Sequence, residues 1–345
     1  MDQELKVVQS LDQTANHPGK RHVQQLLDHF HLEGPNGVHT CLVFEPMGRN
    51  LDSYIFDYQR SQRRPAWQAR DPLPLLFSRH VCKQLLLALD CLHSQGIMHR
   101  DIQPGNILCA LNYELDALSE DEIQNDTETY FIPVERIDRY RRSSGDPMYL
   151  LQAMPINDNV PSTAPPPDFR IILSDLGAAS SFEESGDGLE AYPDMLRAPE
   201  VVLKLPFTEK ADIWNLGCII FEIVFQTRPF STGTIFGTTE EKKDDLLESF
   251  VECLGPMPQH LWSRIPRPLE AVDANGSLRK HKPEELKMNC RFYNLREVME
   301  LRRGKDMSDA ELDAFESFIR STLQYEPDKR PSTQELLQHP WIVDF

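Results

Sequence analysis

Residues 99–108 read HRDIQPGNIL, and this short stretch decides the class of the fold. Asp101 precedes Asn106 by five positions, and apolar residues stand on both sides of the segment. Apolar runs around a polar segment predict a loop between two short strands. A carboxylate in such a loop can orient a hydroxyl group and accept its proton, and an amide oxygen can bind Mg²⁺. The stretch therefore predicts a loop that carries reactive side chains.

A second acidic motif follows an apolar run further along the chain. SDLG at residues 174–177 comes directly after RIIL, which predicts a strand that ends in a turn. Asp175 supplies a second oxygen ligand for Mg²⁺, and Gly177 allows the backbone to turn sharply. Leu176 keeps the apolar packing role that an aromatic residue would have there.

Three more motifs complete an ordered set. They are LRAPEVVL at residues 196–203, KADIWNLGCIIFEI at 210–223 and EPDKRPSTQELLQHPW at 326–341. Phosphoryl transfer requires a carboxylate that orients the attacking hydroxyl and oxygen ligands that hold Mg²⁺. An H-R-D-x-x-x-x-N loop followed by D-L-G and A-P-E is far more specific for this chemistry than any of the motifs alone.

The ordered set resembles the catalytic domain of eukaryotic protein kinases. The resemblance implies an α+β, bilobal fold, with residues 1–47 as a partial N-lobe (helix C, the last strands and the hinge) and 48–345 as a mainly helical C-lobe. It implies that Asp101 orients the hydroxyl, that Asn106 and Asp175 hold Mg²⁺, and that ATP is the phosphoryl donor. It also implies supporting roles for His99, Arg100, Gly177, Arg197, Glu200, Asp212 and Arg330. Glu200 should pair with Arg330, and Asp212 should hold the backbone around His99 and Arg100.

The resemblance extends to the SR-protein kinases, which belong to the CMGC group. HLEGPNGVHTCLVFEPMGRNL at 31–51 resembles their hinge, and especially that of a fungal group of relatives. By this resemblance Phe44 is the gatekeeper, and the backbone of Glu45 and Met47 binds adenine. ECLGPMPQHLW at 252–262 and Arg197 before A-P-E match the wider group, and the long insert at about 110–168 matches the SR-protein kinase spacer. Arg/Ser-rich splicing-type proteins are the implied substrates, and a net charge of −18 suits basic partners.

The sequence departs from the kinase pattern in three places. Residues 1–11 resemble the helix whose glutamate, here Glu4, pairs with the ATP-binding lysine. No Gly-rich loop and no V-A-I-K motif occur in the sequence, and we expect an N-lobe truncated before this helix. Gln103 stands where the catalytic-loop lysine is usual, and Pro193 stands where its threonine partner is usual. Both partners of one contact are thus replaced together.

These departures leave other interpretations open. A catalytically inactive kinase fold that acts as a binding scaffold is one, and a truncated gene product is a close variant. A small-molecule phosphotransferase of the aminoglycoside or choline kinase type is another, because DIQPGNIL resembles its D-x-x-P-x-N loop. Those enzymes lack the A-P-E segment and the ADIWNLG helix, which disfavours this last interpretation.

Composition and periodicity set the remaining expectations. The 345 residues are 40% hydrophobic, and the N-terminus lacks the pattern of a signal peptide, which indicates an intracellular protein of the cytoplasm or nucleus. Seven cysteines without a C-x-x-C pair are expected to be small buried hydrophobes rather than metal ligands, and no nucleic-acid or membrane binding is expected. Apolar spacing predicts helices over 1–14 and 74–95 and strands over 23–30 and 38–45. It predicts mostly helix after 208, and the acidic, proline-punctuated composition of the insert predicts a loop-rich or partly disordered segment.

Overall fold

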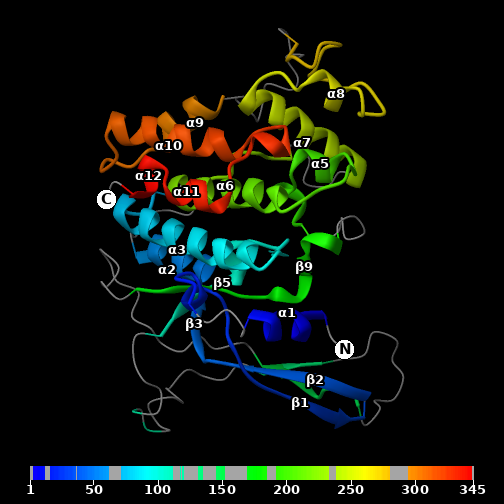
Figure 1. Cartoon of the computed structure of the whole chain (residues 1–345), viewed down its shortest axis with the longest axis vertical. Helices are drawn as coiled ribbons and strands as arrows, with labels where there is room; N and C mark the ends of the chain where they lie inside the picture. The colour runs from blue at the N-terminus through cyan, green and yellow to red at the C-terminus, as the bar shows by residue number, and fades with distance from the viewer. Residues whose placement is uncertain are drawn as a thin grey trace.

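The computed structural model describes residues 3–11, 16–35, 37–61, 71–111, 117, 119, 131–134, 145–151, 169–184, 192–232, 238–279 and 294–343. A helical body forms the larger half of the molecule, and a hairpin of two strands forms the end that contains the N-terminus (Figure 1). Helix α1 (Gln3–Leu11) lies between the hairpin and the helical body. Its apolar face, Leu5, Val7, Val8 and Leu11, is buried, so the predicted N-terminal helix is confirmed.

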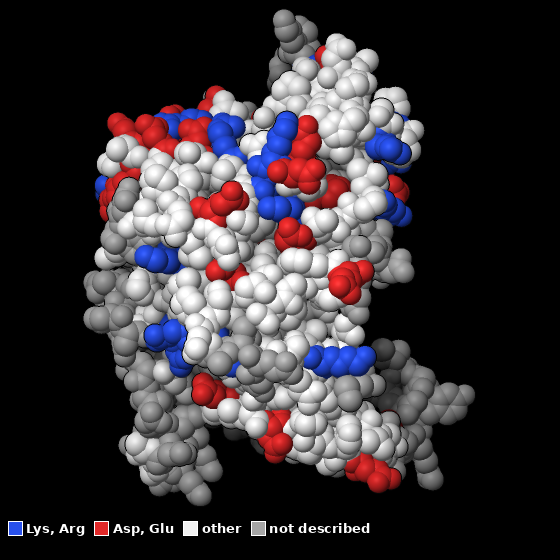
Figure 2. All heavy atoms as spheres, viewed as in Figure 1, with Lys and Arg blue, Asp and Glu red and all other residues white. Residues whose placement is uncertain are grey.

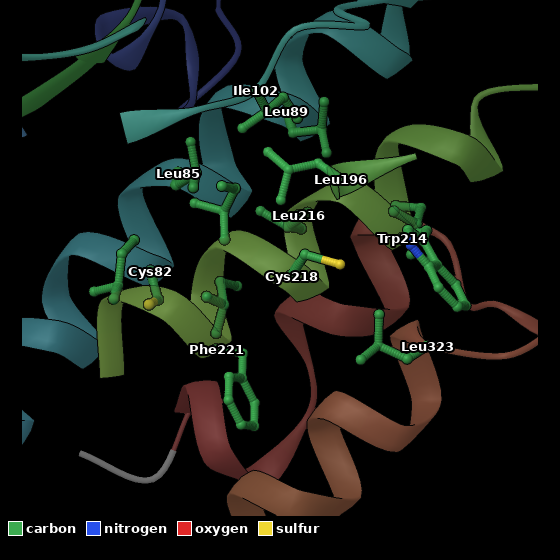
Figure 3. Close-up of a cluster of buried hydrophobic side chains, with 14 of the residues drawn as sticks. Cys82, Leu85, Leu89, Ile102, Leu196, Trp214, Leu216, Cys218, Phe221 and Leu323 are labelled. Carbon is green, nitrogen blue, oxygen red and sulfur yellow. The ribbon is translucent and has the colours of Figure 1, made fainter. Parts of the chain in front are cut away.

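Two helices form the centre of the helical body. Helix α3 (Leu75–Ser94) confirms the helix predicted over 74–95, and α6 (Lys210–Phe225) packs against it. Fourteen residues of α6 are buried, because this helix is apolar on all sides and runs through the interior. Figure 3 shows side chains of both helices meeting in one cluster, among them Cys82, Leu85, Leu216 and Phe221.

The other helices surround this centre. They are α2 (Leu51–Ser61), α5 (Pro199–Val202), α7 (Thr239–Leu254), α8 (Gln259–Trp262), α9 (Leu295–Arg302), α10 (Asp309–Thr322), α11 (Thr333–Leu337) and α12 (Pro340–Val343). Short 3₁₀ helices cover Lys20–His22, Pro104–Asn106, Leu176–Ala178, Phe182–Glu184, Asp194–Leu196 and Pro327–Lys329. Helices α7, α9, α10 and α11 each begin with a capping box, in which a Ser, Thr or Asn and a Glu three positions later satisfy each other's backbone N–H groups.

Short strands place the HRD loop between α3 and the DLG turn. Strand β4 (Ile97–Met98) leads into the loop and β5 (Ile107–Ala110) leads out, which confirms the strand–loop–strand prediction. Strand β5 pairs antiparallel with both β3 (Met47–Asn50) and β8 (Ile171–Leu173), and β4 pairs with β9 (Ser180–Ser181). Because β8 ends directly before SDLG, its pairing with β5 brings Asp175 to the side of the HRD loop.

The N-terminal hairpin differs from the prediction. Strands β1 (Leu26–Gly34) and β2 (Gly37–Phe44) pair antiparallel. Strand β1 begins three residues later than the predicted strand over 23–30. The run TCLVF has the apolar composition of a buried strand, yet its residues are only half-buried, and from Leu27 to His39 the described hairpin is exposed on both faces. No third strand pairs with the hairpin among the described residues, so its apolar side chains, such as Phe30 and Leu32, contact solvent.

A short two-stranded ladder lies within the insert. Strand β6 (Phe131–Pro133) pairs antiparallel with β7 (Tyr149–Leu151), and most of the remaining residues from 112 to 168 lie outside the described part of the chain. Five of the six described cysteines are buried, as predicted, and Cys41 is half-buried, while Cys290 lies outside the described residues. Within the described residues, no helix has the length and apolar character needed to cross a bilayer.

Candidate active site

A single buried carboxylate holds the backbone of the HRD loop. Asp212 of α6 has no exposed surface and accepts the backbone N–H groups of His99 at 2.7 Å and Arg100 at 2.9 Å. It also accepts His93 Nε2 and the Tyr192 hydroxyl, each at 3.1 Å. Arg100 has a φ of 70°, a left-handed conformation that is unfavourable for a residue with a side chain, and the bond from its N–H to Asp212 stabilises it.

The carboxylate of Asp212 is an ionised acceptor despite its burial. Burial acts to raise the pKa of Asp212, but the hydrogen bond and charge of His93 and the N–H of His99 outweigh burial and hold this pKa below its usual range. A buried charge is tolerated when hydrogen bonds compensate for its lost hydration. Here four donors from three separate chain segments provide that compensation.

His99 is a buried, neutral link between the HRD and DLG segments. Burial lowers its pKa, so the imidazole is kept in the uncharged form. Its Nε2 lies 3.1 Å from the carbonyl oxygen of Ser174, and its Nδ1 accepts the N–H of Asp101 at 3.2 Å. A carbonyl can only accept, so the proton of the ring is on Nε2. The ring therefore fixes the backbone on both sides of the site.

Asp101 is held by two side-chain amides. Gln103 Nε2 donates to both carboxylate oxygens, at 2.9 and 3.0 Å, and Asn106 Nδ2 donates to Oδ2 at 2.9 Å and to the Asp101 carbonyl at 3.0 Å. Burial raises the pKa of Asp101 above its usual range, although these two amides partly offset the effect. The result is a half-buried carboxylate that accepts a proton more readily than an exposed aspartate does.

The two residues that depart from the kinase pattern lie in separate contacts. The amide of Gln103 is turned onto Asp101. Pro193 begins the 3₁₀ turn Asp194–Leu196 and carries no side-chain donor or acceptor. A direct side-chain hydrogen bond between positions 103 and 193 is therefore impossible in this sequence.

The two predicted Mg²⁺ ligands are tied together through Ser174. Both the N–H and the hydroxyl of Ser174 donate to the Asn106 carbonyl at 2.9 Å. Asp175 follows with a left-handed φ of 64°, and its exposed carboxylate accepts the N–H of Gly177 at 3.4 Å. Because Asn106 Nδ2 is used on Asp101, its Oδ1 is left without a protein donor among the described residues.

These groups suit Mg²⁺ better than a metal that needs a full protein cage. No group of three or more His, Cys, Asp or Glu side chains that could hold a metal occurs within the described ranges. Mg²⁺ is commonly bound by one or two protein oxygens together with phosphate oxygens and water. One exposed carboxylate and one amide oxygen beside Asp101 fit that requirement.

The predicted nucleotide-side residues lie where the hairpin joins the helical body. Phe44 ends β2 and packs against the core, Glu45 is exposed in the two-residue connection, and Met47 begins β3. Helix α1 brings Glu4 beside the DLG turn, since a methyl group added to Gly177 would lie 3.8 Å from Glu4 Oε2. Helix α1, which carries Glu4, lies on the side of the helical body that faces the hairpin (Figure 1).

The A-P-E helix is anchored by a buried ion pair. Arg330 donates to the two carboxylate oxygens of Glu200 at 2.6 and 2.8 Å, as the family resemblance implied, and both residues are almost fully buried. Arg330 also donates to three backbone carbonyls and lies over the ring of Trp214 at 5.1 Å. Arg197 is half-buried and donates to the Tyr192 carbonyl and to Asp194.

Sequence reasoning missed three residues that build the site. His93 and Tyr192 both donate to Asp212, and Ser174 joins the two predicted Mg²⁺ ligands. His93 stands in the last turn of the predicted helix, directly before the HRD segment, so the sequence could have placed it close to the loop. Tyr192 has no such signal, because its contact with Asp212 spans 20 positions and depends on the path of the chain between them.

The buried Asp212 frame, the HRD and DLG segments and the Glu200–Arg330 pair together define the protein kinase class of fold and site. The sequence pattern of the protein kinase domain matches residues 2–116 and 164–342, and the chain belongs to this family. A serine/threonine protein kinase of Aspergillus fumigatus is 27% identical over 346 residues, which cover 99% of this chain and 75% of that protein. The serine/threonine-protein kinase SRPK of Physarum polycephalum is 27% identical (99% and 76% covered), and protein kinase dsk1 of Schizosaccharomyces pombe is 24% identical (98% and 72%). The predicted resemblance to the SR-protein kinases is thereby confirmed.

Proposed function

We propose that this serine/threonine protein kinase transfers the γ-phosphoryl group of ATP to the hydroxyls of Arg/Ser-rich protein segments. The observation that carries the proposal is the cluster of Asp101, Asn106 and Asp175, which a buried frame holds together. An intracellular location follows from this proposal, because ATP and such substrates are found inside the cell. The roles of the individual residues belong to the same proposal.

Asp101 acts on the attacking hydroxyl. Its carboxylate accepts a hydrogen bond from the substrate Ser or Thr and takes up the hydroxyl proton as the oxygen attacks phosphorus. The raised pKa of Asp101 favours this proton transfer. Asn106 Oδ1 and the Asp175 carboxylate would hold Mg²⁺, which supplies neutralisation of the phosphate charge when it is bound.

Gln103 orients Asp101 rather than contacting the phosphoryl group with a charge. Its amide bonds both carboxylate oxygens, which fixes the plane of the carboxylate. The loop thereby lacks one positive charge at the transition state, a loss on the order of a few kcal/mol when nothing substitutes for it. A slower chemical step than in a lysine-containing kinase is the consequence.

The nucleotide is proposed to bind between the hairpin and the helical body. The backbone of Glu45 and Met47 would pair with adenine, and Phe44 would limit the depth of the adenine site. Glu4 corresponds to the glutamate that pairs with the ATP-binding lysine in the family, and the V-A-I-K motif that carries this lysine does not occur in the sequence. The test of function therefore compares the given chain with a form that is extended upstream.

The charges near the A-P-E helix indicate which substrate side chains can bind there. The chain carries a net charge of −18, and Figure 2 shows acidic and basic side chains interspersed over the helical half of the visible face. Beside the A-P-E helix is a pocket of about 450 Å³ whose charged lining is mostly basic: Arg197, Lys204, Lys242 and Lys243, with Asp194. The mostly basic lining disfavours arginine side chains of a substrate in this pocket.

The experiment is a Mg²⁺–ATP binding and phosphoryl-transfer assay with Arg/Ser peptides, on the given chain and on the extended form. The expected result is transfer that Asp101→Asn abolishes while nucleotide binding is retained, because Asn cannot accept the hydroxyl proton. Glu326→Gln, an exchange in an exposed i,i+3 pair with Lys329, serves as a matched control. Failure of both forms to bind nucleotide would overturn the proposal and favour a binding scaffold.

A further inference from the structure

We propose that Tyr192 is a positioning residue that holds residues 192–198, the proposed substrate-binding segment (hereafter the substrate segment), in register with the HRD loop. The proposal rests on the proposed kinase function and names a residue that the kinase motifs leave out. The position is one residue before Pro193, where the usual contact between the substrate segment and the catalytic loop is lost. Tyr192 supplies a different connection between the same two segments.

The first observation is the hydroxyl contact. Tyr192 is 1% exposed, and its Oη donates to Asp212 Oδ1 at 3.1 Å. The same oxygen accepts the N–H of Arg100 at 2.9 Å, while Oδ2 accepts His99 and His93. Tyr192 and Arg100 thus share one acceptor atom, so the orientation of the phenol affects the position of the oxygen that holds the left-handed Arg100 backbone.

The second observation concerns the ring. Tyr192 packs edge-on against Phe207, with ring centroids 5.9 Å apart and an interplanar angle of 87°. The guanidinium of Arg100 also lies over the ring of Phe207, 5.7 Å from its centroid. The side chains of the catalytic loop and of the substrate segment therefore contact one shared aromatic ring.

The third observation concerns the backbone of Tyr192. Its carbonyl accepts Arg197 Nε at 2.9 Å, and Arg197 pairs with Asp194 at 2.7 Å. Asp194 and Arg197 line the pocket beside the A-P-E helix. Tyr192 therefore binds Arg197 of the pocket lining through its carbonyl, and it binds Asp212, which holds the HRD loop, through its hydroxyl.

The usual side-chain hydrogen bond between the catalytic loop and the substrate segment cannot form between Gln103 and Pro193. Pro193 has no hydroxyl or N–H, and Gln103 Nε2 donates to both oxygens of Asp101. The Tyr192 hydroxyl instead donates to Asp212, whose carboxylate also accepts the N–H groups of His99 and Arg100, so it joins the two segments through this shared carboxylate. The combined change Gln103→Lys with Pro193→Thr should restore the usual hydrogen bond between these two positions. The contribution of Tyr192 to kcat should then be smaller.

The experiment uses the full chain, in its active form, with Tyr192→Phe and the control Tyr325→Phe. Tyr325 is also a buried phenol, and its hydroxyl donates to the Gly255 carbonyl at 2.9 Å, away from the site. Tyr192→Phe should lower kcat on the order of tenfold and leave the KM for ATP unchanged, because one hydrogen bond to a charged acceptor is lost and the hinge is untouched. Tyr325→Phe should lower thermal stability to a similar extent and leave kcat unchanged. In a chain that already carries Gln103→Lys and Pro193→Thr, the effect of Tyr192→Phe on kcat should fall to about twofold or less.

Amide hydrogen exchange provides a readout that does not require activity. In Tyr192→Phe, exchange over residues 97–103 and 192–198 should quicken on the order of tenfold, and in Tyr325→Phe it should not change there. Unchanged exchange in Tyr192→Phe, or an undiminished loss of kcat in the chain with Gln103→Lys and Pro193→Thr, overturns the proposal. Failure of both the given chain and the extended form to bind nucleotide overturns the proposed function instead, and the exchange of these two segments still decides whether Tyr192 holds the loop.

Discussion

Replacing Gln103 by lysine should move the acid limb of the pH–rate profile to lower pH. The Gln103 amide nitrogen lies 2.9 and 3.0 Å from the two oxygens of Asp101, so a lysine ammonium at the same place would be in direct contact with the carboxylate. A neighbouring cation stabilises the ionised form and lowers the pKa of Asp101, which burial currently raises. Asp101 then stays unprotonated, and able to accept the hydroxyl proton, at more acidic pH.

The contact distance sets the size of the effect. Two unit charges about 3 Å apart attract by about 1.4 kcal/mol in bulk water and by about 5.5 kcal/mol at an effective dielectric constant of about 20. Asp101 is only half-buried, so solvent screening favours the lower figure. Since about 1.36 kcal/mol corresponds to one pH unit, the acid limb should move down by about one unit. Gln103→Met removes the donor without adding charge and should move the limb in the opposite direction.

The assay is kcat against pH from about 4.5 to 8 for the wild type and both variants, at saturating Mg²⁺–ATP and peptide. Using kcat restricts the titration to groups in the complex, and ionic strength is held constant because the lysine effect is screened by salt. The Gln103→Lys variant should also have a higher plateau rate, because it restores a positive charge beside the transferred group. An acid limb at the same pH in all three proteins would refute the reasoning, because Asp101 would then not be the group whose protonation limits the rate.

Two further predictions concern stability. Arg330→Leu leaves the Glu200 carboxylate buried and unpaired, and it should lower the free energy of unfolding by about 3–5 kcal/mol. Adding Glu200→Leu to the same chain should recover part of this loss. Urea denaturation measures both variants, and equal losses in the single and the double variant would contradict the ion-pair argument. Gly217→Ala places a methyl group in collision with Thr322 Oγ1 where α6 contacts α10, and it should lower the free energy of unfolding by about 1–3 kcal/mol. Adding Thr322→Ala should recover part of this loss. Thermal unfolding measures both variants, and an unchanged midpoint for Gly217→Ala would show that the two helices can move apart without loss of stability.

The sequence predicted the helical body and the reactive loop well, because both have strong local signals. Helix α3 begins and ends within one residue of the prediction, since its apolar residues recur at helical spacing over about five turns. The strands around residues 99–106 are equally clear, because short apolar runs surround a polar segment. The buried pair of Glu200 and Arg330, 130 positions apart, came from resemblance alone, because spacing and periodicity carry no signal for it.

The features that sequence reasoning missed depend on tertiary contacts. TCLVF has the composition of a buried strand, but full burial requires cover on both faces; Leu42 and Phe44 pack against the core, and no third strand pairs with the hairpin among the described residues. The Tyr192–Asp212 contact joins a single aromatic residue to a helix 20 positions away, which leaves no periodic pattern in the chain. Even the role of Gln103 changed, since its amide is turned onto Asp101 and so is more than a lost charge.

The two perturbed carboxylates of the site respond to acid in a definite order. The pKa of Asp101 is raised, so this carboxylate is the first of the two to take up a proton as the pH falls. The pKa of Asp212 is lowered, so its stabilising effect is present above the pKa of an unfolded aspartate and is lost only when the pH falls through its lower folded value. The frame that holds the His99 and Arg100 backbone is therefore still ionised and in place over the pH range in which Asp101 titrates. Under the proposed function, the acid limb of kcat should therefore report the protonation of Asp101, and the loss of the Asp212 frame should follow only at more acidic pH.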